Sequence, residues 1–320
     1  ISTFLDIYIE RDLKAGKITE KEVDERVDEL LQAALSLPKQ SREKKKELEK
    51  QKEELHRSHH RLAQKAAEES MVLLKNEAEI LPLTAGTRVA VIGDFAFEPR
   101  YQGVGSSSVN AISVENVVEK ISDTDLMVVG MERGYRRDGK ADYNLEAQAL
   151  ELASKAEVIL YFLGLGETEE SEGLDRKNFE IPQNQISLLQ KLTEKNPAIV
   201  AVLSTGSVVD IGWKIDCRAI LHTGLSGEAG AGAVLNVLTG KVNPGGKLTE
   251  SWICHYDDTP SAFVYPAKER TLPYGEGIYV GYRYFEKEQI PVSFPFGFGL
   301  SYTTFTYSGL EVKKTEFACG

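Results

Sequence analysis

The pattern of apolar and polar positions divides the beginning of the chain into three segments. Residues 1–37 place apolar side chains at helical spacing around one short polar turn, which predicts two helices, the second capped by Thr19. Residues 41–60 are rich in Lys, Glu, Arg and His and have almost no apolar side chain to bury, so they are predicted to be a solvated linker or an exposed helix. From residue 62 to residue 76 the helical spacing returns, which predicts a buried helix.

Short runs of β-branched residues then alternate with helical patterns. Strands that are apolar on both faces are typical of parallel sheets covered by helices, so the alternation predicts an α/β fold with a doubly wound, mostly parallel sheet. In such folds ligands bind outside the carboxyl ends of the strands. Residues 274–307 are rich in Gly, Pro and aromatic residues and predict a long ordered excursion with an edge strand. The predicted strands are residues 89–93, 126–130, 158–163, 199–203 and 219–222, and the predicted helices lie near residues 147–153, 185–192 and 229–238.

Composition and charge narrow the class of protein. The chain has 320 residues, and its 42% apolar content is enough to fill a large core. A net charge of −11 disfavours a nucleic-acid partner, and no apolar run approaches the roughly 20 residues of a membrane span. Three cysteines without CxxC spacing predict neither a zinc site nor a disulfide framework, and a cytoplasmic location is expected. The chain begins at Ile1 and stops just after a strand-like run, so we expect it to be a piece of a longer protein.

The loop after the third predicted strand carries the most promising chemistry. Residues 164–176 contain four glutamates and the pair Asp175-Arg176, at the edge where a ligand site is expected. Crowded carboxyl groups raise one another's pKa, which suits a general acid. A solvated acidic loop is the competing interpretation, and composition alone favours it.

Two other features are weaker. Residues 103–108, Gly-Val-Gly-Ser-Ser-Ser, could cradle a phosphate or a sugar, but they match neither GxGxxG nor a P-loop, and a flexible turn is an equal alternative. The histidines lack the spacing of a metal site, and His222 is interpreted as a core residue. Reasoning from the residues alone therefore reaches a doubly wound domain with an acidic loop, and no reaction follows from it.

Several segments together resemble the second domain of glycoside hydrolase family 3. One is Glu-Gly-Leu-Asp-Arg at residues 172–176, and the variant at residues 245–252 is most similar to bacterial β-glucosidases of the family. The matches occur in family order across almost the whole chain after residue 62. The resembling segments are residues 66–77, 80–83, 89–93, 172–176, 181–185, 238–248, 274–285 and 294–305.

The resemblance also implies a domain organisation. Residues 1–37 are similar to the last helices of the family's barrel domain, residues 38–60 would be a charged linker, and residues 61–307 would form the α/β sandwich. Residues 308–320 resemble the start of a fibronectin-like domain. The family's nucleophilic Asp belongs to a Ser/Thr-Asp-Trp motif on the barrel, and this sequence contains no such motif.

Site residues follow from the resemblance position by position. Glu172 matches the general acid/base, with Glu169 and Glu170 as alternatives because the family is irregular in this loop. Ser106 matches a segment that reaches toward the sugar, whereas Asp175 and Arg176 are expected to brace the loop as well as to lie near the substrate.

The resemblance thus implies part of a retaining β-glucosidase that needs no metal or organic cofactor. Its substrate would be a β-glucoside or an oligosaccharide, and its partner the barrel domain that carries the nucleophile, so the isolated chain is expected to hydrolyse little. The specificities of a β-xylosidase or an α-arabinofuranosidase remain open. A non-catalytic carbohydrate-binding or interaction module of the same fold is the alternative of a different class.

Overall fold

The computed structural model of the chain describes residues 9–50, 52–262, 264–267 and 270–312. The chain divides into two compact units, Ile1–His59 and His60–Gly320, which we describe separately. Residues 1–8 of the predicted barrel helices and residues 313–320 of the predicted fibronectin-like segment lie outside the described residues.

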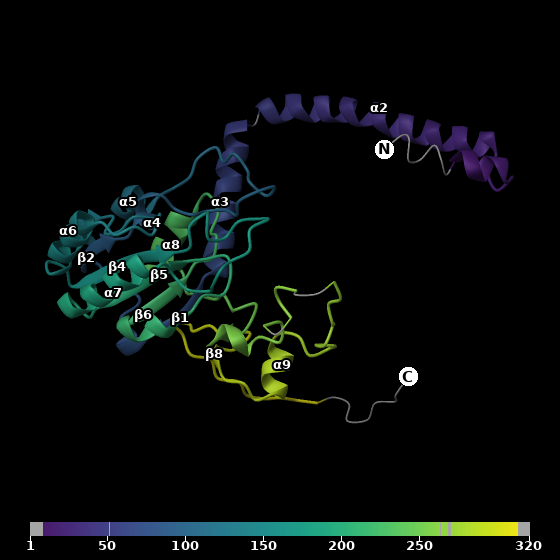
Figure 1. Cartoon of the computed structure of the whole chain (residues 1–320). Helices are drawn as coiled ribbons and strands as arrows, with labels where there is room; N and C mark the ends of the chain where they lie inside the picture. The colour runs from purple at the N-terminus through teal and green to yellow at the C-terminus, as the bar shows by residue number, and fades with distance from the viewer. Residues whose placement is uncertain (1–8, 51, 263, 268–269, 313–320) are drawn as a thin grey trace. The chain divides into compact units, whose positions relative to one another are not determined.

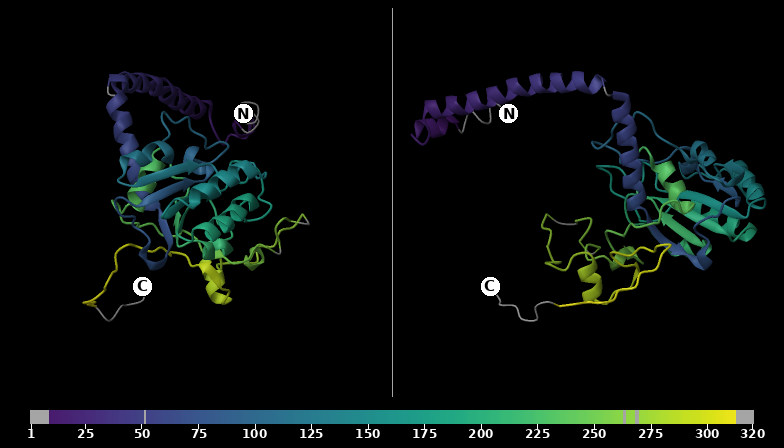
Figure 2. Two further views of the ribbon diagram at one scale, coloured as in Figure 1. Left: turned by 90° about the vertical axis from the view of Figure 1, so that its left-hand side faces the viewer. Right: turned by 180° about the vertical axis from the view of Figure 1, so that it is seen from behind.

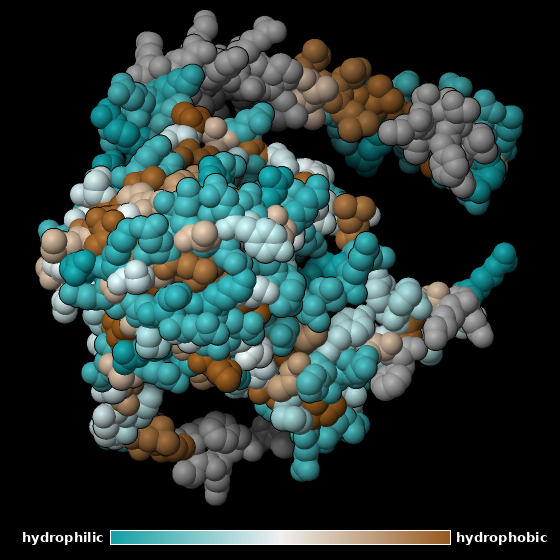
Figure 3. Space-filling view, turned by 60° about the vertical axis from the view of Figure 1, so that its left-hand side comes forward, coloured by the Kyte–Doolittle hydropathy of each residue, from teal (hydrophilic) through white to brown (hydrophobic). Residues whose placement is uncertain are grey.

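The first unit is built on a long helix, α2 (Glu20–Lys50). Thr19 caps it as predicted: the backbone N–H of Thr19 donates to Glu22 Oε2 at 2.8 Å, and the backbone N–H of Glu22 donates to Thr19 Oγ1 at 3.2 Å. The charged segment after residue 41 is helical, first within α2 and then within α3 (Lys52–Ser70). Figure 3 shows hydrophobic atoms gathered along this helix, and four of its apolar residues are exposed: Val27, Leu30, Leu31 and Leu35.

Strand β1 (Val72–Asn76) corrects the predicted helix over residues 62–76. Helix α3 ends at Ser70, and the next four side chains, all apolar, are buried: Met71, Val72, Leu73 and Leu74. A strand that is covered on both faces buries successive side chains, whereas a surface helix buries only one stripe. The prediction was wrong because a short apolar run fits both periods, and here pairing with another strand decides between them.

The second unit contains one six-stranded sheet in the order β1-β6-β5-β4-β2-β3 (Figure 1). All neighbouring strands are parallel except β1, which runs antiparallel to β6. This confirms the doubly wound, mostly parallel sheet, and β4 at its centre is buried along its whole length. The parallel strands are β2 (Arg88–Ile92), β3 (Met127–Glu132), β4 (Val158–Gly164), β5 (Ile199–Ser204) and β6 (Ala219–His222).

Helices cover both faces of this sheet (Figure 2). On one face α6 (Tyr143–Ala153) packs against α7 (Gln183–Lys195), and on the other α5 (Val117–Lys120) packs against α8 (Gly230–Leu238). The helices predicted near residues 147, 185 and 229 are therefore confirmed. Strand β2 lies between β3 and β4, so the strand order reverses there, and a doubly wound sheet binds its ligands at such a reversal.

The segment after α8 forms a second, smaller layer. Strands β7 (Trp252–Ile253) and β8 (Val292–Phe294) pair antiparallel, with the rings of Trp252 and Phe294 6.4 Å apart in an edge-to-face contact. The predicted excursion with a strand is confirmed, but the short helix α9 (Tyr282–Lys287) was not predicted, because its aromatic sequence lacks a helical period. Over the described part of the chain, none of the helices has the length and apolar content needed to cross a membrane.

The ring of His60, the first residue of the second unit, ties α3 to the rest of that unit. Its Nε2 lies 3.0 Å from Glu115 Oε1 and its Nδ1 lies 3.0 Å from Glu228 Oε1. Glu115 also accepts a hydrogen bond from the backbone N–H of Gly232 and pairs with Lys120. The hydrogen bond to Glu115 and the second one to Glu228 raise the pKa of His60 against the opposing effect of its partial burial. The imidazolium form therefore bridges two carboxylates.

This bridge predicts a pH-dependent stability. Because the pKa of His60 is raised in the folded protein, protonation of His60 stabilises the fold. This stabilisation is fully present below the ordinary pKa of 6.5 and is lost as the pH rises through the folded-state pKa. We expect His60→Gln to lower the free energy of unfolding by about 1–2 kcal/mol at pH 6 and by less at pH 9. Urea unfolding followed by tryptophan fluorescence measures this, since Trp213 and Trp252 both lie in the second unit. The exposed neighbour His59→Gln is the control, and equal losses at both pH values would contradict the prediction.

Candidate active site

Two loops that were predicted separately meet at the reversal of strand order. The loop that follows β2 and the one-turn helix α4 (Asp94–Phe97) carries Ser106, and the loop after β4 carries Glu172. The backbone N–H and the hydroxyl of Ser106 both donate to Oε2 of Glu172, each at 2.6 Å. The structure therefore brings two predicted site residues into direct contact, although they stand 66 positions apart in the sequence.

Gly105 allows this close approach. Its backbone has φ = 100°, a conformation that favours glycine, and a Cβ atom at this position would collide with the side chain of Glu172. The glycine and hydroxyl pattern of residues 103–108 thus serves to hold a carboxylate, a role that the sequence analysis did not consider.

The electrostatic setting of Glu172 differs from the expectation. Crowded carboxyls were expected to raise its pKa, but in this structure the side chain is exposed and hydrogen bonds from the Ser106 hydroxyl and N–H lower the pKa. Hydrogen bonds to the charged form favour ionisation, and water around an exposed carboxylate does the same. Glu172 is therefore held as a carboxylate in this chain.

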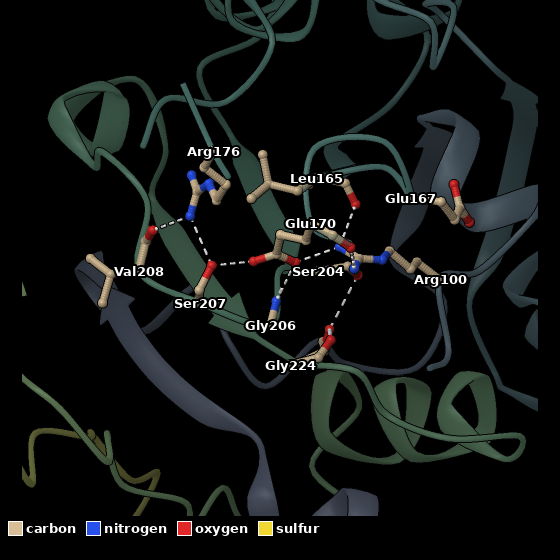
Figure 4. Close-up of polar contacts among 12 residues, drawn as sticks. Arg100, Leu165, Glu167, Glu170, Arg176, Ser204, Gly206, Ser207, Val208 and Gly224 are labelled. Carbon is tan, nitrogen blue, oxygen red and sulfur yellow. Dashed lines mark hydrogen bonds and ion pairs between the residues drawn. The ribbon is translucent and has the colours of Figure 1, made fainter. Parts of the chain in front are cut away.

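Glu170 points the other way, into a buried ion pair with Arg100. The side chains are 10% and 2% exposed, respectively. Arg100 contacts both the carboxylate and the backbone oxygen of Glu170, while Gly206 N–H and the Ser207 hydroxyl donate to the same carboxylate (Figure 4). Burial opposes ionisation, yet the donors from Ser207 and Gly206 and the charge of Arg100 hold the pKa of Glu170 below its usual range.

Arg176 joins this group from the same loop. Its Nη1 donates to Ser207 Oγ at 2.8 Å and to the carbonyl oxygen of Val208 at 2.9 Å. Burial lowers its pKa, and its Nε and Nη2 atoms are buried without a partner among the described residues. We name Arg100, Glu170, Arg176, Gly206 and Ser207 the bracing cluster, because together they join the loops that follow β2, β4 and β5.

The remaining predicted residues lie around this cluster. Asp175 forms a hydrogen bond with Tyr265, which raises the pKa of the tyrosine. Glu169 has a buried Oε2 without a partner in the described part of the chain. Glu167 is 48% exposed and pairs with Arg137 at 3.3 Å. Of the four loop glutamates, Glu167 and Glu172 are exposed, and Glu172 is the one that accepts two short hydrogen bonds on a single oxygen.

Sequence reasoning missed Arg100 and Ser207. Their partner Glu170 lies 70 and 37 positions away, respectively, and no local spacing reveals such pairs. The available signal was an arginine, the one basic residue between residues 94 and 115, opposite a loop with excess acid.

A small polar pocket of about 190 Å³ adjoins the bracing cluster at Gly206 and Ser207 and is also lined by His222 and Glu250. Burial lowers the pKa of His222 to about 4, so its ring is neutral, and it packs edge-on against Trp252. The ring is in the core as expected, but its Nδ1 has no hydrogen-bond partner among the described residues. No group of His, Cys, Asp or Glu in that part of the chain has the arrangement of a metal site.

The bracing cluster yields a stability prediction. We expect Glu170→Gln to lower the free energy of unfolding by about 3–5 kcal/mol, because the buried Arg100 charge loses its counter-charge. Glu167→Gln removes an exposed pair on the same loop and should cost at most about 1 kcal/mol. Urea unfolding of both variants checks this, and equal effects would mean that Glu170 does not brace the loops.

Comparisons with known proteins agree with this architecture. Residues 71–302 match the family described as the glycosyl hydrolase family 3 C-terminal domain. Thermostable beta-glucosidase B of Acetivibrio thermocellus is 38% identical over 310 residues, which cover 95% of this chain and 40% of that protein. An exo-alpha-(1->6)-L-arabinopyranosidase of Bifidobacterium longum is 40% identical over 265 residues, which cover 79% of this chain and 35% of that protein.

Solved structures give the same result. The crystal structure of a GH3 beta-glucosidase from Bifidobacterium adolescentis is 38% identical, with a TM-score of 0.82 over 98% of this chain and 45% of that chain. Beta-glucosidase 3B from Thermotoga neapolitana, solved in complex with glucose, is 27% identical with a TM-score of 0.75 over 96% of this chain and 46% of that chain. The chain thus spans less than half the length of these relatives. With the family match over most of its length and the same fold in solved members, the chain belongs to glycosyl hydrolase family 3.

Proposed function

We propose that this chain contributes Glu172 as the general acid/base of a retaining glycoside hydrolase. The observation that carries the proposal is the contact between Ser106 and Glu172 at the reversal of strand order. It holds one oxygen of an exposed carboxylate and leaves the other, Oε1, available to a substrate. The nucleophilic carboxylate comes from a barrel domain of the kind that the resemblance implies.

Each half of the reaction uses Glu172 once. In the first half the protonated carboxyl gives its proton to the glycosidic oxygen, while the nucleophile bonds to the anomeric carbon and the leaving group departs. In the second half the carboxylate takes a proton from water as the water oxygen replaces the nucleophile. The two carboxyls of a retaining site stand about 5 Å apart, so the nucleophile must approach Glu172 closely.

The lowered pKa of Glu172 in this chain matches only the second half of this cycle. The first half needs the protonated form of Glu172. Solvent exposure and the two hydrogen bonds from Ser106 disfavour that form. We infer that a barrel domain and a bound sugar cover Glu172, remove its water and raise its pKa. The acid/base function thereby depends on assembly of the site, which is why the isolated chain is expected to hydrolyse little.

Ser106, Asp175 and Arg176 support this site in different ways. After donating to Glu172, the Ser106 hydroxyl keeps lone pairs that can accept from a sugar hydroxyl, in agreement with the expected substrate contact. Asp175 and Arg176 hold the loop through Tyr265, Ser207 and Val208, so bracing is their main role.

A terminal β-D-glucosyl residue is the proposed substrate, since relatives named as beta-glucosidases match most of the chain. An α-linked L-arabinopyranoside is a second candidate, because a relative named for that activity is 40% identical. Both sugars are pyranosides, and the choice between them rests with groups that grip the ring hydroxyls.

The test is hydrolysis of aryl glycosides by the chain combined with a family 3 barrel domain that carries the nucleophile. We expect Glu172→Gln to lower kcat/KM for an unactivated aryl β-glucoside by about 10²–10⁴-fold, the usual contribution of a general acid. With a dinitrophenyl leaving group, which needs no protonation, the first half survives and the covalent intermediate accumulates. Glu180→Gln, an exposed change further along the chain, is the control.

Several outcomes would contradict the proposal. Full activity of Glu172→Gln would move the acid/base to another carboxylate, with Glu169 the next to be changed. Activity of the isolated chain would place a nucleophile within it. Sugar binding without hydrolysis in the combined sample would favour the non-catalytic binding module.

A further inference from the structure

We propose that Ser106 is a positioning residue that assigns the two oxygens of Glu172 different tasks: Oε2 is held by the protein, and Oε1 alone carries and transfers the proton. The inference rests on the proposed function and extends it, because it names the reacting atom and the residue that selects it.

The first step is the direction of the hydrogen bonds. The Ser106 N–H and hydroxyl both lie 2.6 Å from Oε2. A backbone N–H can only donate, so a proton on Oε2 would face another proton across this short contact. Protonation at Oε1 keeps both hydrogen bonds, and it is therefore the favoured site of the acidic proton.

The second step is the rigidity of the contact. The loop that carries Ser106 is closed by its own bonds, since Val109 N–H donates to Gln102 Oε1 at 2.8 Å and Gln102 Nε2 donates back to the Val109 carbonyl at 3.0 Å. Arg100 begins the same loop and is buried against Glu170, two residues before Glu172. One ion pair thus anchors both partners of the Ser106–Glu172 contact.

The third step is the charge balance around Glu172. Residues 101–109 contain no Asp, Glu, Lys, Arg or His, and their one titratable group, Tyr101, accepts from the side chain of Gln102. On the loop of Glu172, the charge of Glu170 is matched by Arg100 and that of Glu167 by Arg137, and Glu169 turns one carboxylate oxygen into the interior. Asp175 and Arg176 form hydrogen bonds with other segments. Ser106 is therefore the main local control on the ionisation of Glu172, and its hydrogen bonds lower the pKa.

The hydrogen bonds from Ser106 affect the two proton transfers of the reaction in opposite directions. When the proton leaves Oε1 for the glycosidic oxygen, the new negative charge spreads over the carboxylate, and Ser106 stabilises it at Oε2. When water later gives its proton to Oε1, that stabilisation opposes the step. Ser106 thus promotes the transfer of the proton from Glu172 to the glycosidic oxygen and opposes the transfer of a proton from water to Glu172. It keeps both transfers on Oε1.

The first experiment needs no catalysis. The carboxyl carbon of Glu172 is titrated by NMR in the chain with ¹³C-labelled glutamate, using the loss of its signal in Glu172→Gln as assignment. We expect Ser106→Ala to raise the pKa of Glu172, since one donor is lost while the backbone N–H remains. Ser106→Thr should restore the lower pKa, and Ser107→Ala, a change in the same loop, should leave it unchanged. An unshifted titration in Ser106→Ala, or an equal shift in Ser107→Ala, would overturn the proposal.

The second experiment uses the chain combined with the barrel domain. We expect Ser106→Ala to move the alkaline limb of the kcat/KM profile to higher pH. It should also lower kcat/KM for an unactivated aryl glucoside by about 10–100-fold, the effect of one hydrogen bond to a charged group. Ser106→Thr should recover both. A uniform loss at all pH values would indicate a merely structural role and overturn the proposal. A shifted NMR titration beside an unshifted pH profile would show instead that Ser106 controls Glu172 but that Glu172 is not the acid/base.

Discussion

The buried ion pair between Arg100 and Glu170 is the constraint on which the site depends. It joins the loops after β2 and β4, and through Gly206 and Ser207 it adds the loop after β5. A buried ion pair seldom adds net stability over an apolar pair of the same shape, but the loss of one partner is costly. Its value here is geometric, because Ser106 and Glu172 lie on the two loops that the pair holds together.

Two glutamates on one loop show how environment divides the roles of identical side chains. Glu170 is buried and its carboxylate is occupied by the bracing cluster, whereas Glu172 is exposed and has one held oxygen. Both have lowered pKa values, for different reasons: Ser207, Gly206 and Arg100 overcome burial at Glu170, and Ser106 acts on an exposed group at Glu172. A fixed carboxylate holds loops in place, and a half-free one can exchange a proton.

Sequence reasoning predicted the sheet well where physical signals were local. The strands from β2 to β6 are largely apolar runs, α6 and α7 have a helical period, and α8 is apolar along almost its whole length. Strand β1 was mistaken for a helix because its identity depends on pairing with β6, which lies far along the chain. Glu172 and Ser106 were identified from resemblance, but their contact, the role of Gly105 and the downward pKa shift depend on tertiary contacts between distant loops.

The exposed backbone of an edge strand affects how a protein behaves in concentrated solution. β1 stands at the edge of the sheet, where unpaired backbone groups invite a strand from another molecule. The backbone N–H of Leu300 donates to the carbonyl oxygen of Leu73 at 2.8 Å, so the segment after β8 occupies part of that edge. This hydrogen bond takes no part in the chemistry of the site, but it discourages association between the sheets of two molecules. A segment near the end of the α/β domain thereby protects β1, the first strand of its sheet.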